Sequence, residues 1–382
     1  MRKRILITSM NVGSGHRMPA LAVEEALHEL FPRGVQTRVV DFARDADARW
    51  TDYILKKSWY FMLAHPGFTN AMYDSFLEGH VTVSTHLPLV LMRDFFSRAP
   101  RFIHEYQPDI VFSTYFFATY AAVLARRRGL YDGKVLQMVV DPFTAHPWWA
   151  MNRLCEEHYV ASERSRAKLV GLGVPVERVR MVSFPLRSEF RRELSQSRQD
   201  VVAQLGLEPQ WRTVLVSPGG EGITNIPRFV KEICRHGMRF NIIYVCGRST
   251  EAKRDMESFL AERRPVTRVV PLGYVDTMPE LLAAADFAIA KPGASTTMET
   301  LAMEKPVIFT QYCGYQEKSN VEYVVRNRLG WHVKSLSELL LLLRTINESN
   351  LLDVYQQRLA RAGLHSGSRE IAGLIGQHLN LC

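Results

Sequence analysis

The sequence predicts an α/β protein made of two Rossmann-like domains that face each other across a cleft. Short apolar runs rich in β-branched residues alternate with helical patterns over most of the 382 residues. Uninterrupted apolar strands that alternate with helices are typical of parallel sheets covered by helices on both faces. The alternation stops at one polar run, residues 195–200, and then begins again. The chain is also longer than a usual single domain of about 100–200 residues.

These observations place one domain at residues 1–194 and a second at residues 201–349. Residues 350–382 are expected to form helices that pack back towards the N-terminal domain. Ligands of such sheets bind beyond the carboxyl ends of the strands. The loops at those ends are therefore the first candidates for a functional site.

The first domain is expected to begin with a strand at 4–8, a glycine-rich turn and a helix at 19–30. A further helix is expected at 118–127. The other strands, each a short and mainly apolar run, are expected at 37–42, 109–113, 135–141 and 158–161.

The second domain repeats the same alternation. Its expected strands are 213–217, 241–246, 268–271, 287–290 and 306–310. Its expected helices are about 225–236, 250–262, 294–303 and 317–327.

Residues 50–105 interrupt the alternation, because helical patterns follow one another there without a strand. Lys56 and Lys57 lie among many aromatic residues, which are Trp50, Tyr53, Trp59, Tyr60, Phe61, Phe68, Tyr73 and Phe76. The segment is either a helical cap with a local aromatic core or an amphipathic platform for an apolar acceptor or a membrane surface.

The composition excludes several classes of protein. Hydrophobic residues make up 47% and charged residues 23%, which excludes a disordered chain. Five cysteines without CxxC spacing exclude a disulfide scaffold and a thiolate zinc site, and they favour a reducing compartment. No apolar run reaches the ~18 residues of a membrane span, so we expect a protein that stays inside the cell. The net charge of +9 suits anionic partners, whether nucleic acid, phosphorylated metabolites or an anionic membrane.

The loop after the first strand carries a candidate base. Gly13-x-Gly15 resembles part of a dinucleotide fingerprint, but Met18 stands where the third glycine or alanine belongs. His16 lies instead at the start of the following helix, where an imidazole could take a proton from a substrate hydroxyl. A structural histidine is the alternative interpretation.

Two loops of the second domain are typical of anion sites. Residues 217–222 (Ser-Pro-Gly-Gly-Glu-Gly) and 291–299 (Lys-Pro-Gly-Ala-Ser-Thr-Thr-Met-Glu) each join a strand to a helix. Glycines there let backbone N–H groups approach a ligand, and the helix adds its positive end. Glu299 lies about one turn into its helix, where a carboxylate can accept both ribose hydroxyls. A third loop, 314–320, adds polar side chains at the same edge.

In this order and spacing the motifs resemble glycosyltransferase family 28, in the group of monogalactosyldiacylglycerol synthases and processive diacylglycerol glucosyltransferases. The likeness covers almost the whole chain and is weakest over 50–105. The motifs are the GxGH loop at 13–16, Gln107-Pro108-Asp109-Ile110, Asp141 with His146-Pro147, Phe184-Pro185-Leu186-Arg187, GGEG at 219–222, Gly247-Arg248, Gly273-Tyr274-Val275, KPG at 291–293, Glu299, and Gln316-Glu317 with Asn320 and Tyr323.

The resemblance implies a GT-B fold, a uridine-diphosphate sugar as donor and a role for each matching residue. His16 would be the catalytic base, and Glu299 would hold the ribose. The diphosphate would be faced by Gly219, Gly220, Glu221, Gly222, Gly293, Ala294, Ser295 and Thr296. Tyr274 and Val275 would lie beside the uracil, and Gln316, Glu317 and Asn320 would contact the sugar. Gly15, Asp141 and His146 would bind or position the acceptor.

The implied reaction is an inverting transfer of glucose or galactose to a lipid such as diacylglycerol. Helix N-termini would stabilise the leaving diphosphate, so no metal and no other cofactor is expected. The DxD run Asp45-Ala46-Asp47 is therefore not expected to bind a metal. The expected partners are a UDP-sugar, a lipid acceptor and an anionic membrane surface, without nucleic acid. We expect a cytoplasmic protein attached peripherally to the inner face of the cell membrane, with Trp59, Tyr60 and Phe61 entering the interface.

Three other classes stay open from the sequence. A UDP-sugar 2-epimerase uses two such domains and similar loops without a lipid-facing segment. An NAD-dependent oxidoreductase is disfavoured by Met18. A non-catalytic nucleotide-sugar sensor or membrane-binding protein would keep Glu299 without needing His16. A transferase with a non-glycerolipid acceptor also remains possible.

Overall fold

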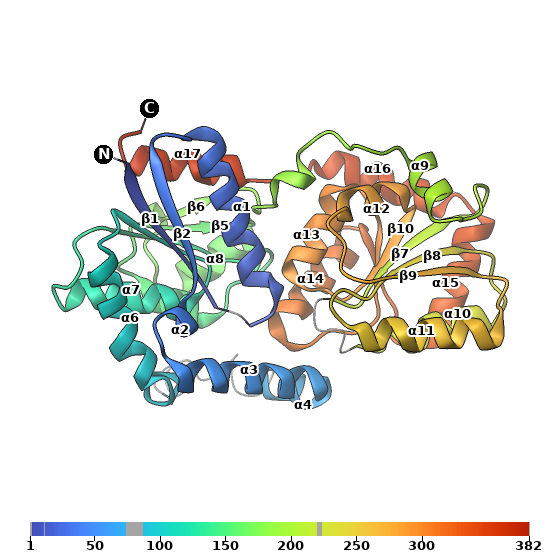
Figure 1. Cartoon of the computed structure of the whole chain (residues 1–382), viewed down its shortest axis with the longest axis horizontal. Helices are drawn as coiled ribbons and strands as arrows, with labels where there is room; N and C mark the ends of the chain where they lie inside the picture. The colour runs from blue at the N-terminus through green and yellow to red at the C-terminus, as the bar shows by residue number, and fades with distance from the viewer. Residues whose placement is uncertain (1, 11, 74–86, 220–223, 382) are drawn as a thin grey trace. The chain divides into compact units, whose positions relative to one another are not determined.

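The computed structural model describes residues 2–10, 12–73, 87–219 and 224–381 (Figure 1). The chain forms two compact units. The first contains Met1–Ser188, Cys313–Gln316 and His365–Cys382, and the second contains Glu189–Tyr312 and Glu317–Leu364. Each unit is built on its own parallel sheet of six strands. The predicted α/β class with two Rossmann-like domains is confirmed.

The polar run 195–200, expected to be a linker, in part begins a helix. Ser197 forms a capping box with Asp200 at the start of α9 (Arg198–Gln204), and the Asp200 carboxylate accepts the N–H of Ser197 at 2.9 Å. The N-terminal stretch of the first unit ends earlier than the predicted boundary at 194, at Ser188. Polar residues suit a helix cap as well as a linker, so composition alone did not distinguish the two.

The sheet of the first unit has the strand order β2-β1-β3-β4-β5-β6. Its strands are β1 (Lys3–Ser9), β2 (Val35–Asp41), β3 (Ile110–Ser113), β4 (Lys134–Met138), β5 (Glu157–Val160) and β6 (Val179–Met181). All five predicted strands are present. The sequence patterns did not reveal β6, because this edge strand has three residues and two of them are exposed.

Helices cover this sheet, and the first of them differs from its predicted bounds. They are α1 (Ser14–Leu30), α2 (Phe42–Asp45), α7 (Phe116–Arg127), α8 (Glu163–Gly171) and α17 (Ser368–His378). The α1 helix begins before its predicted start at Pro19, which lies inside it. His16 is therefore in the first helical turn. Figure 1 shows α17 beside α1, against which it packs.

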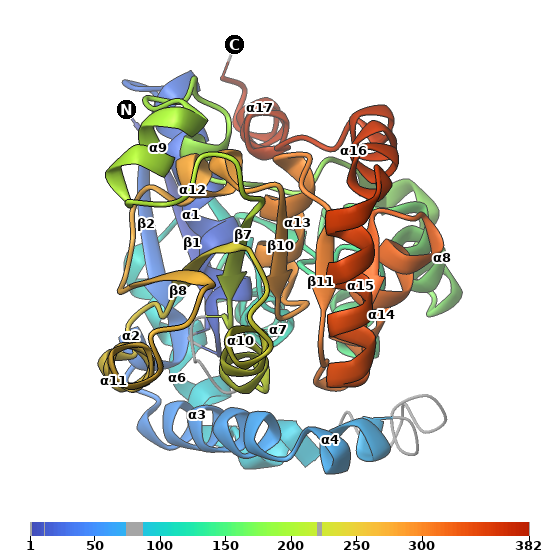
Figure 2. The same cartoon turned by 90° about the vertical axis from the view of Figure 1, so that its right-hand side faces the viewer.

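The aromatic segment is helical, as predicted. It contains α3 (Arg49–Ala64), α4 (Pro66–Met72), helical residues 87–91 and α6 (Arg93–Tyr106), and Figure 2 shows α4 continuing from α3. Residues 74–86, which include Phe76, lie outside the described part. The Asp94 carboxylate accepts the N–H groups of Trp50 and Thr51 at 3.1 and 3.3 Å. It thereby caps α3 from a distant part of the chain.

The second sheet has the order β12-β11-β10-β7-β8-β9. Its strands are β7 (Thr213–Ser217), β8 (Asn241–Val245), β9 (Arg268–Leu272), β10 (Phe287–Ala290), β11 (Val307–Phe309) and β12 (Gly330–His332). All five predicted strands are again present, and β12 is additional. At Gly330 a Cβ atom would lie 2.1 Å from the carbonyl oxygen of Val307, so β12 needs glycine to approach β11.

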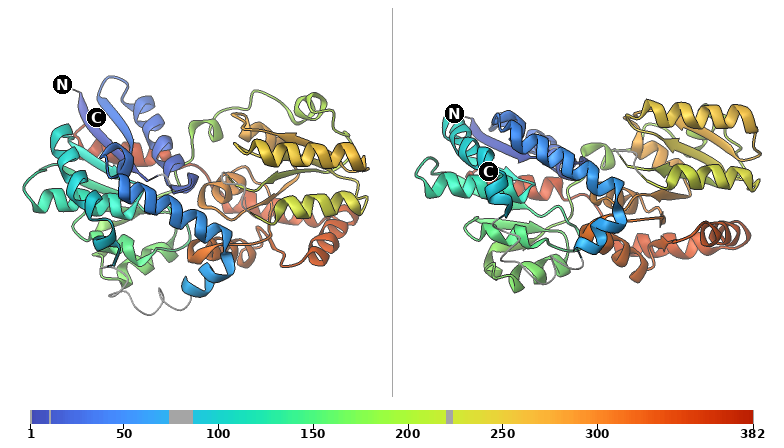
Figure 3. Two further views of the ribbon diagram at one scale, coloured as in Figure 1. Left: turned by 60° about the horizontal axis from the view of Figure 1, so that its bottom comes forward. Right: turned by 90° about the horizontal axis from the view of Figure 1, so that it is seen from below.

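Eight helices accompany this sheet in the described part of the chain. Besides α9 they are α10 (Ile226–Arg235), α11 (Thr250–Arg263), α12 (Met278–Ala284), α13 (Ala294–Ala302), α14 (Gly314–Arg326), α15 (Leu336–Glu348) and α16 (Leu351–Ala362). Residues of α10, α11 and α15 share one core with β7, β8 and β10. Figure 3 shows α10 and α11, in yellow, running beside each other.

The order in which strands are added to this parallel sheet reverses between β7 and β10. These strands are hydrogen-bonded neighbours, and Ser217 at the end of β7 pairs with Ala290 at the end of β10. From β7 the chain passes to β8 on one side, whereas from β10 it passes to β11 on the other. In a doubly wound sheet, such a switch point is where ligands bind.

Candidate functional site

His16 is held in one tautomer by the end of β3. Its Nδ1 lies 2.7 Å from the carbonyl oxygen of Thr114, and the Thr114 hydroxyl donates to the His16 carbonyl at 2.7 Å. A carbonyl oxygen only accepts hydrogen bonds, so Nδ1 carries the proton. In the neutral ring the lone pair is then on Nε2, which is the atom that can accept a proton from a substrate.

The surroundings keep this ring neutral. It packs edge-on against Tyr115, with ring centroids 4.7 Å apart. Burial lowers the pKa of His16 from 6.5 to about 4, although the hydrogen bond to Thr114 acts in the opposite direction. A neutral imidazole at neutral pH fits the predicted role of base.

Asp141 and His146, predicted to position the acceptor, follow β4 and are buried. The Asp141 carboxylate accepts the indole N–H of Trp149 at 2.7 Å, and burial raises its pKa to about 6. The His146 Nδ1 accepts the backbone N–H of Trp148 at 3.2 Å, and burial lowers the pKa of His146 to about 3. The other nitrogen of His146, Nε2, is buried without a hydrogen-bond partner in the described part of the chain. The acceptor role of both residues, and of Gly15 in α1, stays a prediction.

Trp59 does not lie where the sequence prediction placed it. A Cβ atom added to Gly13 would come within 3.2 Å of the indole ring of Trp59, so this ring covers the loop that leads to His16. Gly13 also has a positive φ of 75°, which favours glycine. The ring is partly buried, whereas Tyr60 and Phe61 are 48% and 51% exposed. Packing against Gly13 therefore corrects the expectation that Trp59 enters a membrane.

The two predicted donor loops leave adjacent strand ends at the switch point of the second sheet. Gly219 follows β7 with a φ of 83°, and residues 220–222, which include the predicted Gly220, Glu221 and Gly222, lie outside the described residues. The loop after β10 leads into α13, whose N-cap residue Gly293 provides no side-chain cap. Gly293 has no side chain that could accept the first N–H groups of α13, which belong to Ala294, Ser295 and Thr296. These N–H groups can therefore bind an anion.

Glu299 lines a small cavity beneath this loop. The cavity has a volume of about 40 Å³, and Ser217 and Thr296 also line it. Its other lining residues come from β7, β10, α12 and α13. Ser217 and Ala290, which end β7 and β10, line the same cavity as Glu299. The ribose role of Glu299 stays a prediction.

Two of the three predicted sugar contacts bind the loop after β10 instead of being open to solvent. Glu317 forms an ion pair with Lys291 at 2.5 Å. Asn320 donates from Nδ2 to the carbonyl of Pro292 at 2.8 Å. The sequence interpretation gave Lys291 no role, although a cation directly after a strand and before Pro-Gly was a usable signal. The third residue, Gln316, lies in the first turn of α14.

The residues predicted beside the uracil follow β9. Tyr274 is 59% exposed, and the guanidinium of Arg248 lies 5.5 Å from its ring centroid. Val275 is partly buried. The exposed tyrosine ring is available for stacking, and its role stays a prediction.

In the Asp45-Ala46-Asp47 run, Asp47 is engaged with cations. The Asp47 carboxylate pairs with Arg49 at 2.8 Å and with Arg98 at 2.6 Å, and these partners lower its pKa. Within the described ranges, no group of three or more His, Cys, Asp or Glu residues is arranged to hold a metal ion.

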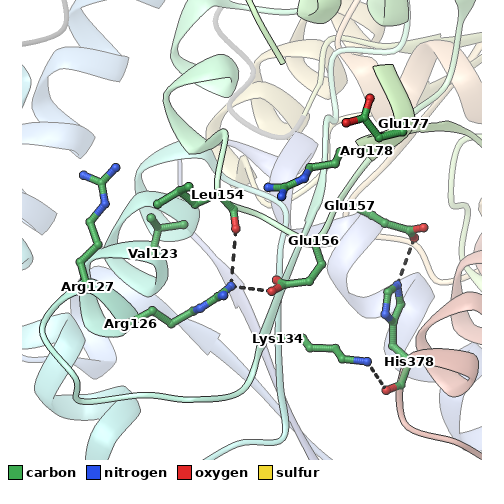
Figure 4. Close-up of a pocket in the computed structure, with 10 residues that line it drawn as sticks. All are labelled: Val123, Arg126, Arg127, Lys134, Leu154, Glu156, Glu157, Glu177, Arg178 and His378. Carbon is green, nitrogen blue, oxygen red and sulfur yellow. Dashed lines mark hydrogen bonds and ion pairs between the residues drawn. The ribbon is translucent and has the colours of Figure 1, made fainter. Parts of the chain in front are cut away.

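A larger cavity of about 630 Å³ contains none of the predicted site residues (Figure 4). It lies at the amino ends of β4 and β5, whereas His16 follows the carboxyl end of β1. Its charged groups mostly bind each other. Arg126 pairs with Glu156 at 2.6 Å, His378 with Glu157 at 3.2 Å, and Lys134 donates to the carbonyl of His378 at 2.8 Å.

In the part of the chain that the structure describes, no helix has both the length and the apolar character needed to cross a bilayer. The exposed large apolar residues cluster in the aromatic segment. Among the described residues of that segment eight are exposed in this way, and they are Trp50, Tyr53, Tyr60, Phe61, Phe68, Leu87, Val90 and Leu91.

Two family models match the chain, one in each unit. The model of monogalactosyldiacylglycerol (MGDG) synthase matches residues 16–186. The model of the glycosyltransferase family 28 C-terminal domain matches residues 213–364. The MGDG synthase match begins at His16, and the family 28 match contains β7, β10 and Glu299.

Curated relatives carry related names. The chain is 26% identical over 351 residues to monogalactosyldiacylglycerol synthase of Spinacia oleracea, which covers 88% of this chain and 65% of the relative. It is 26% identical over 328 residues to processive diacylglycerol beta-glucosyltransferase of Bacillus subtilis, which covers 84% of this chain and 81% of the relative. The chain thus spans slightly less than two thirds of the spinach protein.

Solved structures share the fold at low identity. MurG of Acinetobacter baumannii superimposes with a TM-score of 0.62 at 14% identity, over 98% of this chain and 99% of that one. MnaA of S. aureus, solved with UDP, has a TM-score of 0.62 at 12% identity, over 100% of this chain and 98% of that one. These likenesses confirm the predicted GT-B fold.

Proposed function

Because the chain belongs to glycosyltransferase family 28, in the group of monogalactosyldiacylglycerol synthases and processive diacylglycerol glucosyltransferases, we propose that it is a UDP-sugar-dependent hexosyltransferase. The hexose is glucose or galactose, and the acceptor is a lipid such as diacylglycerol. The observation that carries the proposal is the tautomer of His16, whose Nδ1–H is bound by Thr114. A protein that only sensed a nucleotide sugar would not need a base held in this way.

The proposed reaction is a single displacement with inversion. Nε2 of His16 accepts the proton of the acceptor hydroxyl, and the oxygen attacks the anomeric carbon. The bond between that carbon and the diphosphate breaks, and its electron pair leaves with UDP. A positioned base of this kind contributes about 10²–10⁴-fold to a rate.

The second unit supplies the proposed donor site. The N–H groups at the start of α13 and the backbone at Gly219 after β7 face the diphosphate, while Glu299 accepts the ribose hydroxyls. A helix N-terminus carries roughly half a positive charge, and anions are stabilised there. With these groups in place, the proposed reaction needs no metal and no other cofactor. The solved structures of Anabaena Alr3699/HepE with UDP and with UDP-glucose, at 13% and 14% identity, share this fold.

The aromatic segment is the proposed membrane contact. Its exposed rings Tyr60, Phe61 and Phe68 lie on α3 and α4, where Lys57 is also exposed. Apolar rings bury themselves at the boundary between headgroups and acyl chains, and each nearby cation adds about 1 kcal/mol on an anionic surface. We infer a peripheral attachment to the inner face of the cell membrane, where a lipid acceptor is available.

The test is transfer to a lipid product. The protein is incubated with radiolabelled UDP-glucose or UDP-galactose and with vesicles that contain diacylglycerol, and the products are extracted into organic solvent. Counts in the lipid phase support the proposal, and the label that is transferred identifies the hexose. His16→Gln is the matched control, because glutamine keeps a polar side chain but cannot act as the base. Counts that stay in free sugar or in an altered nucleotide sugar would refute the transferase.

A further inference from the structure

Lys291 lies where the two proposed diphosphate loops meet. It directly follows β10, and its backbone N–H donates to the carbonyl of Ser217 at the end of β7 at 3.4 Å. A Cβ atom added to Gly219 would lie 3.7 Å from Cδ of Lys291. The lysine stem therefore runs along the start of the glycine loop, between the two chain segments that would face the donor.

The ammonium group of Lys291 ends on a carboxylate. Nζ lies 2.5 Å from Oε1 of Glu317 in the first turn of α14, and the two side chains are only 12% and 9% exposed. The desolvation of two buried charges can cost more free energy than their attraction returns, so a covered pair is weak evidence for a purely stabilising role. A fixed cation beside an anion site is the alternative that this position favours.

Groups around the same loop lack protein partners. Ser295 Oγ, Thr297 Oγ1 and Asn320 Oδ1 are buried without a hydrogen-bond partner among the residues described. Leaving a buried polar group unpaired is unfavourable, so a ligand or a water is expected to complete these bonds. The cation of Lys291 thus lies in a region whose polar atoms are not all satisfied by the protein.

We propose that Lys291 is a further catalytic residue, whose ammonium contacts the diphosphate of the bound donor. Glu317 is a positioning residue that holds Nζ there. The inference rests on the proposed function and deepens it by naming the cation that stabilises the leaving group. When the sugar–phosphate bond breaks, its electron pair goes to the phosphate oxygen. Lys291 keeps its proton and acts through its charge alone.

Binding of UDP and of uridine to the full chain separates this role from a structural one. Both are titrated by calorimetry, and uridine is the probe without phosphates. We expect Lys291→Met to weaken UDP binding by about tenfold to a hundredfold, the loss typical of one bond between charged groups. Uridine affinity should stay within twofold, because the nucleoside does not reach Lys291. Lys291→Arg should restore part of the UDP affinity.

A double variant and a control variant separate the loss of a UDP contact from a loss of folding. Lys291→Met leaves a buried carboxylate unpaired, so the double variant Lys291→Met/Glu317→Gln, which removes both charges, is measured beside it. The double variant should bind UDP no more weakly than Lys291→Met alone, because Glu317 acts through Lys291. Lys231→Met is the matched control, since it breaks an ion pair with Asp255 (2.8 Å) between α10 and α11. This control should leave UDP binding unchanged.

The outcomes distinguish this inference from the proposed function. If the wild-type chain binds UDP and the double variant binds it within twofold of wild type, Lys291 does not contact the diphosphate. An equal loss of UDP and uridine affinity would also overturn the inference, because it indicates a structural ion pair. A wild-type chain that binds neither ligand overturns the proposed function together with the inference.

Discussion

Acid tolerance of the reaction follows from the burial of His16. A histidine works as a base only while its ring is neutral, and burial lowers the pKa of His16 to about 4. At about pH 5.5, a ring with this pKa remains more than about nine tenths neutral, whereas a ring with the ordinary pKa of about 6.5 is only about one tenth neutral. The two cases differ by about tenfold in rate. We expect kcat/KM to stay near its neutral value to about pH 5 and to halve near pH 4.

The assay is the initial rate of transfer to diacylglycerol in vesicles between about pH 4 and pH 8, with the donor well below its KM. Circular dichroism and UDP titration at each pH verify that the fold and the donor site persist. Asp141→Asn is measured in parallel, because the pKa of Asp141 is raised to about 6 and this group titrates in the same range. A midpoint near pH 6.5 in the wild type would refute the reasoning. A midpoint that disappears in Asp141→Asn would assign the titration to Asp141.

Three further predictions concern the donor site and the aromatic segment. Glu299→Ala should weaken UDP binding by about 2–5 kcal/mol, because the ribose hydroxyls lose a charged acceptor. Calorimetry measures this loss, and an unchanged UDP affinity in a folded variant would refute the ribose assignment. Asn320→Ala deletes the hydrogen bond that holds the loop after β10 and should lower the unfolding free energy by about 1 kcal/mol in urea titrations. No change in the midpoint would show that this bond does not stabilise the fold. The double variant Tyr60→Ser/Phe61→Ser should lose the part of its sedimentation with anionic vesicles that resists salt. Trp59→Ala should still bind vesicles but should have a lower transfer rate. The reverse pattern would contradict the packing of Trp59 on Gly13.

The elements that the sequence predicted are those whose pattern is local. The buried strands of both sheets are continuous apolar runs, and a glycine-rich turn follows the first strand in each unit, so their positions were visible from composition and period. His16 and Glu299 could be singled out because each lies near the start of the helix that follows a strand, at the sheet end where ligands bind. The three-residue edge strands β6 and β12 were not visible, since short, partly exposed strands carry little apolar pattern.

Tertiary structure decided which side chains are in contact. The sequence interpretation assigned Glu317 to the sugar and gave Lys291 no role, and only the packing of α14 near the end of β10 makes them a covered ion pair. Trp59 belongs to an aromatic run that suits either a core or a membrane, and its contact with Gly13 arises from how α3 folds back on the loop before α1. The physical reason is the same for both pairs. Periodicity reports which face of a helix or strand is apolar, whereas a contact between distant residues depends on the path of the whole chain.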